Sequence, residues 1–162
     1  MGRTGTTRRR ALMVTGVIAA GTLSGCAGGS SARVSGSPAA RASADAELRK
    51  RLATASGTLR DRYDATLALH PGLAERLSPM RASVTEHITA LGGPPGNAPP
   101  VPLPPPVPAD ETAALASLAA AERHTADTHT AALDDAGPEL ARLLASLAAA
   151  GAAHVYLLGG AR

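Results

Sequence analysis

Apolar side chains recur at steps of three, four or seven residues along four stretches of the chain, the spacing that places side chains on one face of an α-helix. These stretches span residues 45–69, 73–91, 110–133 and 138–158. Their stripes consist of Leu48, Leu52, Ala55, Leu59, Tyr63 and Leu67; Leu73, Leu77, Met80, Val84, His87 and Leu91; Leu115, Leu118, Glu122, Thr125, His129 and Leu133; and Leu140, Leu144, Leu147, Gly151, His154 and Leu158. The pattern predicts an all-α domain built from four helices.

Proline and glycine mark the predicted ends of these helices. His70-Pro71-Gly72 separates the first two, because the residue before a proline disfavours the helical conformation. Asp110 is suited to cap the third helix, and Pro138 opens the fourth at a position where its missing N–H costs nothing. Pro79 lies inside the second stretch, so that helix is either kinked there or begins near Ser78.

Residues 92–109 contain nine prolines in 18 residues and cannot form a regular helix or strand. A polyproline II segment rises about 3.1 Å per residue, so this one reaches on the order of 50 Å, which exceeds the roughly 30 Å length of a 20-residue helix. It can therefore cross from one end of a bundle to the other and leave the third helix parallel to the second. The alternative is a docking segment for a proline-binding partner. The position of the segment between two helical pairs favours the crossover.

The predicted connections are short, long and short in that order. Four helices of about 20 residues joined in this way have the ferritin-like arrangement, in which two antiparallel pairs are linked by one long crossover. We therefore predict a four-helix, ferritin-like domain over residues 45–158, with residues 92–109 as its Pro-rich crossover.

Among the polar residues on these stripes, we single out His87, Glu122 and His154, each at a position where the helical period calls for an apolar side chain. All three are therefore expected to face the core. Glu122 should lie level with a residue near position 151, one turn from His154. A carboxylate and two imidazoles could hold a single metal ion such as Zn²⁺, with water as the fourth ligand. The favoured alternative is that they are buried polar residues that hydrogen-bond to one another or to water, because a buried carboxylate needs a partner.

A ferritin-like di-iron site needs a Glu from each of two helices and a Glu-x-x-His motif from each of the other two. Here the two motifs read Val84-Thr85-Glu86-His87 and Gly151-Ala152-Ala153-His154, so both lack the Glu at their first position. The first helix offers Ala55 and Leu59, and only Glu122 remains. One carboxylate supplies too few oxygen ligands for a pair of hard cations.

The same region resembles a group of actinobacterial lipoproteins with a ferritin-like domain of unassigned function. The resemblance covers residues 45–158. It rests on Tyr63-Asp64-Ala65 before the His-Pro turn, on the Pro-rich middle, and on Glu139-Leu140-Ala141-Arg142-Leu143-Leu144 leading to His154. It implies a helical bundle on an exported, lipid-anchored protein.

The N-terminal segment has the composition of an export signal. Arg8, Arg9 and Arg10 precede an uncharged stretch that ends at Ser24. A stretch of about 14 residues is too short to span a bilayer, which needs roughly 20. A basic start followed by a short apolar run predicts a secretory signal over residues 1–25. The surroundings of the arginines loosely resemble a twin-arginine signal, so the export route stays open.

Leu23-Ser24-Gly25-Cys26 resembles a bacterial lipobox, in which the Cys receives a diacylglyceryl group and the signal is cleaved just before it. Cys26 is also the only cysteine in the chain, so an internal disulfide is excluded. We expect Cys26 to anchor the protein on the extracytoplasmic face of the cell membrane, and residues 26–44 to form a flexible tether rich in Gly, Ser and Ala. The alternative is an ordinary signal with a chance cysteine.

The charge of the chain argues against nucleic acid as a partner. Of the 16 Lys and Arg residues, four precede Cys26, whereas all 13 Asp and Glu residues follow it. The exported part thus carries 12 basic and 13 acidic side chains, and the basic footprint of a nucleic-acid-binding protein disappears.

No catalytic motif stands out in the sequence. It contains no Gly-x-Ser-x-Gly, no Gly-rich phosphate loop and no Cys-x-x-Cys. The other histidines predict no site, because His70 precedes a turn, His124 points off its stripe and His129 lies near a helix end. We expect a non-enzymatic module without a cofactor that binds an envelope protein or a small ligand. The alternative is a degenerate metalloprotein or oxidoreductase that uses His87, Glu122 and His154.

Overall fold

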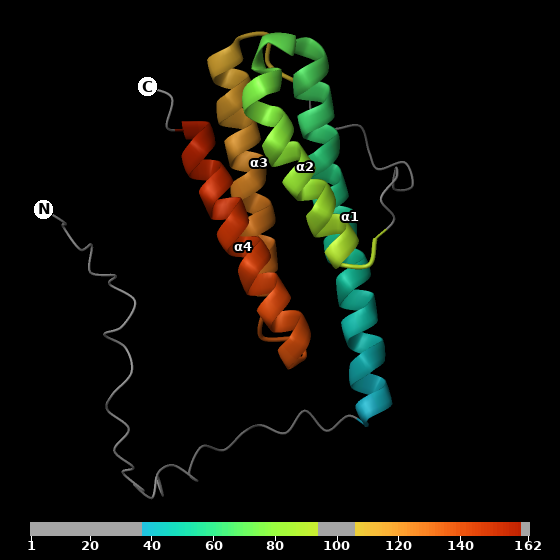
Figure 1. The fold of residues 1–162 in the computed structure, drawn as a ribbon. Coiled ribbons are helices and arrows are strands. Elements are labelled where there is room, and N and C mark those ends of the chain that lie inside the picture. The colour runs from blue at the N-terminus through green and yellow to red at the C-terminus, as the bar shows by residue number, and fades with distance from the viewer. Residues whose placement is uncertain (1–36, 94–105, 160–162) are drawn as a thin grey trace, which may run out of the picture. The chain divides into compact units, whose positions relative to one another are not determined.

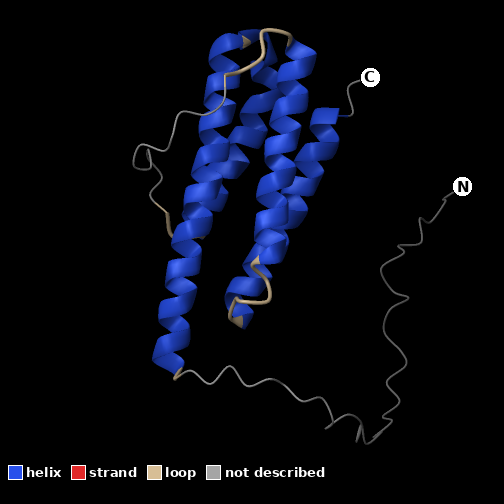
Figure 2. Ribbon diagram, turned by 180° about the vertical axis from the view of Figure 1, so that it is seen from behind, coloured by secondary structure: helices blue, strands red, loops and turns tan. Residues whose placement is uncertain are grey.

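The computed structural model describes residues 37–93 and 106–159, and every regular element in these ranges is helical. In chain order these elements are α1 (Pro38–Leu69), the short 3₁₀ helix η1 (Pro71–Leu73), α2 (Ala74–Ala90), α3 (Glu111–Ala131) and α4 (Pro138–Gly159). They form a four-helix bundle, as the stripes predicted (Figures 1 and 2). The predicted signal, its lipobox at Leu23-Ser24-Gly25-Cys26 and most of the Pro-rich segment lie outside the described residues.

Helix α1 begins at Pro38, so the prediction that a flexible tether extends to residue 44 is wrong. Ser37 caps the helix, because its side chain accepts a hydrogen bond of 3.2 Å from the Ala40 amide, and Pro38 is suited to a first helical position. Asp45 also lies inside the helix, where its carboxylate accepts a hydrogen bond of 2.9 Å from the Gly137 amide in the α3–α4 turn. This contact ties α1 to the α3–α4 turn at the first residue that the sequence predicted to be helical.

Helix α2 begins at Ala74 and contains Pro79, so a start near Ser78 is wrong. Pro79 lies in the second turn of the helix, where its missing N–H leaves only one carbonyl, that of Glu75, without its helical partner. The Ser78 hydroxyl donates to the Ala74 carbonyl at 2.6 Å and closes the first turn. Gly92, at φ 79°, then ends the helix in a left-handed conformation that suits glycine.

The third and fourth helices follow the predicted boundaries closely. Asp110 is the N-cap of α3, as predicted, and its carboxylate accepts from the Ala113 amide at 2.7 Å. α3 ends at Ala131, two residues before the predicted end at Leu133. α4 begins at Pro138 and its buried face contains all six predicted positions: Leu140, Leu144, Leu147, Gly151, His154 and Leu158.

Helices α1 and α2 form one antiparallel pair, and α3 and α4 form the other (Figure 1). The His70 imidazole Nε2 lies 2.8 Å from the Pro108 carbonyl oxygen, so the start of α3 is held beside the α1–α2 turn. Arg76 at the start of α2 donates to the carbonyls of Leu157 and Leu158, which places the end of α4 there too. α3 therefore runs parallel to α2, as the predicted crossover requires.

The core consists of two apolar clusters at different heights along the bundle. The first cluster contains Leu48, Leu52, Ala53, Leu91, Ala132, Leu140, Leu144 and Leu147. The second contains Leu59, Tyr63, Leu77, Met80, Val84, Leu118 and Leu158. The sequence positions of these residues leave a gap around residues 56 on α1, 87 on α2, 122–129 on α3 and 151–154 on α4. The side chains in this gap are mostly polar.

Of the described helices, α4 is the one whose length and composition would allow it to cross a membrane. The core helix of a bundle passes the same test. In this structure the leucine stripe of α4 is buried against the other helices, and His154 lies on that same buried face.

Candidate functional site: a polar layer in the bundle core

Glu122 on α3 is the centre of the polar part of the core and is only 2% exposed. Its Oε1 atom accepts a hydrogen bond of 2.6 Å from the Tyr63 hydroxyl on α1. The same oxygen lies 2.9 Å from Nδ1 of His154 on α4. One carboxylate oxygen thus joins three helices. Both partners can donate to it, so the burial of this carboxylate is offset by two hydrogen bonds.

His87 on α2 extends this arrangement to the fourth helix. Its ring stacks on that of His154, with the centroids 6.3 Å apart and an interplanar angle of 13°. Its Nε2 atom lies 3.2 Å from the Ser83 hydroxyl, one turn earlier on the same helix. The His87 side chain is only partly buried, so it forms the outer edge of the cluster.

A second pair lies two helical turns away along the same α1–α3 contact. The His129 ring is 2% exposed, and its Nε2 atom lies 3.4 Å from the Ser56 hydroxyl. Ser56 and Tyr63 are separated by seven residues on α1, as are Glu122 and His129 on α3, so a single antiparallel register produces both contacts. Nδ1 of His129 is the one buried side-chain nitrogen or oxygen without a hydrogen-bond partner in the described parts of the chain.

We call the six residues that meet here the polar layer: Ser56, Tyr63, His87, Glu122, His129 and His154. Burial raises the pKa of Tyr63, and the negative charge of Glu122 raises it further, so the phenol stays protonated and donates. Burial lowers the pKa of His129 to about 4, and the neighbouring His87 acts in the same direction. Burial and the proximity of His154 also lower the pKa of His87. His87 and His129 are therefore neutral at pH 7.

Gly151 on α4 provides the space that this arrangement needs. A Cβ atom at this position would lie 3.0 Å from the Ala126 Cβ and 3.6 Å from Glu122 Oε2. The first distance is shorter than an ordinary contact between two methyl groups. The glycine at the first position of the Gly151-Ala152-Ala153-His154 motif thus lets α3 and α4 approach closely beside the Glu122 carboxylate.

The structure brings together the three residues that the stripe pattern singled out. Glu122 and His154 are in direct contact, close to the predicted level, and His87 lies against His154. The sequence pattern placed Tyr63 and His129 on the stripes without assigning them to the cluster, and it did not single out Ser56. His129, which predicted no site because it lies near a helix end, is buried in the core and contacts Ser56.

The same geometry tests whether His87, Glu122 and His154 could act as metal ligands. Imidazole nitrogens offer their lone pairs in the plane of the ring, and the nearly parallel rings of His87 and His154 do not direct theirs to one point. Nδ1 of His154 and Oε1 of Glu122 are also hydrogen-bonded to each other. Within residues 37–93 and 106–159, no three His, Cys, Asp or Glu side chains are placed to hold one ion. In this arrangement Glu122 and His154 thus contact each other, and the rings of His87 and His154 do not converge on a common point.

Comparison of the chain with family models, curated proteins and solved structures found no match.

Proposed function

We propose that this protein is a lipid-anchored, extracytoplasmic module with a ferritin-like helical bundle, which binds a small ligand or an envelope partner and does not catalyse a reaction. In this proposal the polar layer stabilises the bundle and sets its register. The observation that carries it is the double hydrogen bond on Glu122 Oε1. Tyr63 and His154 occupy the oxygen that a metal ion or a substrate would otherwise contact.

Two features support the ferritin-like assignment. The connections are short, long and short, and the contact between His70 and Pro108 places the start of α3 beside the α1–α2 turn, at the opposite end of α2 from its last residue. Glu122 and His154 also lie in the middle of the bundle, level with positions where the metal-binding members of this architecture carry their ligands. The proposal treats the polar layer as what remains of such a site after its other carboxylates were lost.

The location rests on the N-terminal sequence. A basic start, a short uncharged stretch and a lipobox that ends in Cys26 support export and acylation. The balance of 12 basic and 13 acidic side chains from Cys26 onward supports a partner other than nucleic acid.

The alternative is a degenerate metalloprotein that uses His87, Glu122 and His154. One observation favours it: Nδ1 of His129, beside this cluster, is buried without a partner in the described residues. Binding would require the contact between Glu122 and His154 to open.

Metal analysis of the purified full chain separates the two functions. The purified chain is equilibrated with Zn²⁺, Mn²⁺ or Fe²⁺ and then passed through a gel-filtration column. We expect it to retain less than about 0.1 equivalent of any transition metal, because a metal site needs a complete set of ligands. One bound ion per chain that is lost in both Glu122→Ala and His154→Ala would replace the proposed function with the metalloprotein.

A further inference from the structure

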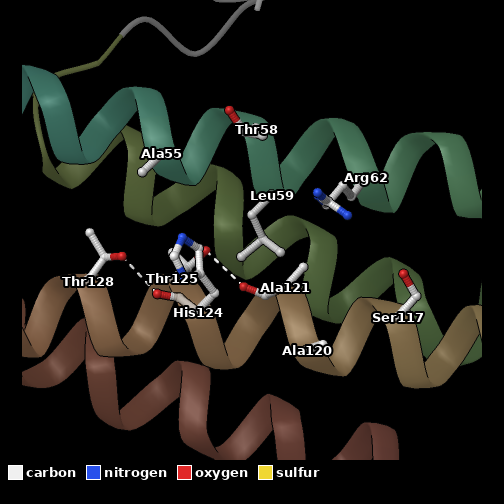
Figure 3. Close-up of a pocket in the computed structure, with 10 residues that line it drawn as sticks. All are labelled: Ala55, Thr58, Leu59, Arg62, Ser117, Ala120, Ala121, His124, Thr125 and Thr128. Atoms are coloured by element: carbon white, nitrogen blue, oxygen red, sulfur yellow. Dashed lines mark hydrogen bonds between the residues drawn. The ribbon is translucent and has the colours of Figure 1, made fainter. Parts of the chain in front are cut away.

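A groove of about 490 Å³ runs along the surface of the bundle between α1 and α3, which is a size typical of small-molecule sites (Figure 3). Its floor and walls are mostly small or apolar, with Ala55 and Leu59 from α1 and Ala120 and Ala121 from α3. Figure 3 shows Leu59 reaching from α1 toward α3 in the middle of the groove. The small alanine side chains leave the space open between the two helices.

Arg62 is the one permanently charged side chain among the described residues that line the groove. Arg62 on α1 and His124 on α3 are its titratable side chains, and no Asp or Glu is among the described residues that line it. Arg62 has no ion pair with any described residue, because the two nearest carboxylates on α1 are engaged elsewhere. Asp61 pairs with Arg60 at 2.9 Å, and Asp64 pairs with Arg81 at 2.7 Å.

Arg62 lies toward one end of the groove. It also borders a small cavity together with Val107 and Pro108, the residues that lead into α3. The hydrogen bond between His70 and the Pro108 carbonyl fixes these residues against the bundle. The guanidinium is therefore placed beside a fixed wall, with the apolar floor formed by Leu59 and Ala121 extending away from it.

We propose that this groove binds a small, freely diffusing organic anion, a carboxylate or a phosphate ester joined to a short apolar chain. Arg62 pairs with the anionic group, since a guanidinium matches the planar fork of a carboxylate or the oxygens of a phosphate. The apolar chain covers Leu59 and Ala121, and the His124 ring faces it from α3. This inference rests on the proposed function as a binding module and names the class of its ligand.

The test uses the full chain in nanodiscs of neutral lipid, with ¹³C-methyl alanine as the reporter. Hexanoate and hexyl phosphate are titrated, with hexylammonium and 1-hexanol as probes of equal chain length and different charge. We expect the anions to shift the methyl signals of Ala55, Ala120 and Ala121 in a saturable way. We expect Arg62→Gln to weaken this binding about tenfold or more, as the loss of a hydrogen bond to a charged group does.

Arg123→Gln is the matched control, because it removes the same charge one residue from His124 but outside the groove. It should leave the affinity for hexanoate within about twofold of that of the parent protein, because salt screens the effect of a solvent-exposed charge. Equal weakening by both variants would overturn the proposal, as would equal shifts with 1-hexanol or hexylammonium, or no shift with either anion. Shifts produced by anionic lipid alone would also overturn it, because they would assign the groove to the membrane surface. None of these outcomes depends on the metal analysis of Glu122 variants, so this proposal and the non-metal role of the polar layer can fail separately.

Discussion

The hydroxyl of Tyr63 on α1 donates a hydrogen bond of 2.6 Å to the Glu122 carboxylate on α3, and it does so from a fully buried position. This contact connects the two antiparallel helix pairs at the level where the core changes from apolar to polar. It is the shortest of the hydrogen bonds that hold the polar layer together. Its removal should therefore lower the free energy of unfolding of the whole bundle.

Replacing Tyr63 by Phe removes this donor and keeps the ring. We expect Tyr63→Phe to lower the free energy of unfolding by about 1.5–3 kcal/mol, the range for a hydrogen bond to a charged group. Urea denaturation of the full chain measures it. Tyr156→Phe is the control, since Tyr156 is 77% exposed and should change nothing measurable. Similar losses in both variants would show that the hydroxyl of Tyr63 contributes nothing specific.

The stability of the bundle should fall as the pH is lowered from about 6.5 to 4. The folded protein keeps His129 neutral down to a pKa of about 4, whereas the same residue titrates near 6.5 in an unfolded chain. The unfolded state therefore binds more protons in this window, and acid favours it. His87, whose pKa burial also lowers, acts in the same direction.

His129→Gln removes one of the groups that bind a proton in the unfolded state but not in the folded state, because glutamine does not titrate. We expect it to reduce the slope of the free energy of unfolding against pH by up to about 1.4 kcal/mol per pH unit within this window. Denaturation curves at pH 4.5, 5.5, 6.5 and 7.5 give the slope. His124→Gln, at an exposed position on the same helix, should leave the slope unchanged. A parental slope in His129→Gln would contradict the assignment.

Gly151→Ala should destabilise the protein although alanine is normally the better helix former by about 1 kcal/mol. The added methyl would lie 3.0 Å from the Ala126 Cβ, and both atoms are fixed to helix backbones. Thermal unfolding should show a lower Tm for Gly151→Ala and a recovery when Ala126→Gly is added. Gly159→Ala, whose Cβ would meet nothing within 4 Å, serves as the control. A rise in Tm for Gly151→Ala alone would refute the close approach of α3 and α4.

The membrane anchor is tested at Cys26. In the Cys26→Ser variant the thiol that would carry the lipid is absent, so we expect a chain that is either uncleaved or released into the medium, without acyl mass. Mass spectrometry of the mature N-terminus and labelling with a fatty-acid analogue check this. A lipid-labelled band that persists in the variant would rule out Cys26 as the point of attachment.

The sequence predicted most of what depends on a single helix. The leucine stripe of α4 placed His154 on the buried face, and the capping preference of Asp110 placed the start of α3 within one residue. It missed the first turns of α1, although Ser37 and Pro38 are residues suited to the start of a helix. The Gly, Ser and Ala content of residues 26–44 indicated a flexible tether instead.

The members of the polar layer that the sequence missed depend on the register between α1 and α3. Tyr63 lies on an apolar stripe, so the sequence indicates only that its ring is part of the core. The contact of its hydroxyl with Glu122 becomes apparent only in the structure. Ser56 and His129 meet through the same register two turns away. The helical period fixes which residues share a face of one helix but not how two helices align, so the periodicity of α1 or α3 alone could not supply this register.

The central claim is that the polar layer is complete without a metal ion. The most direct measurement compares the free energy of unfolding of the full chain after exhaustive chelation with that of the same chain at about 100 μM Zn²⁺, Mn²⁺ or Fe²⁺. A site with a Kd of about 1 μM would add about 2.7 kcal/mol at this metal concentration, by mass action. We predict that the free energies of unfolding with and without metal agree within about 0.5 kcal/mol, the level at which independent effects usually agree. We also predict that Glu122→Ala lowers the free energy of unfolding by a similar amount under both conditions. A metal-dependent increase of that size in the parent, absent from Glu122→Ala, would contradict the account.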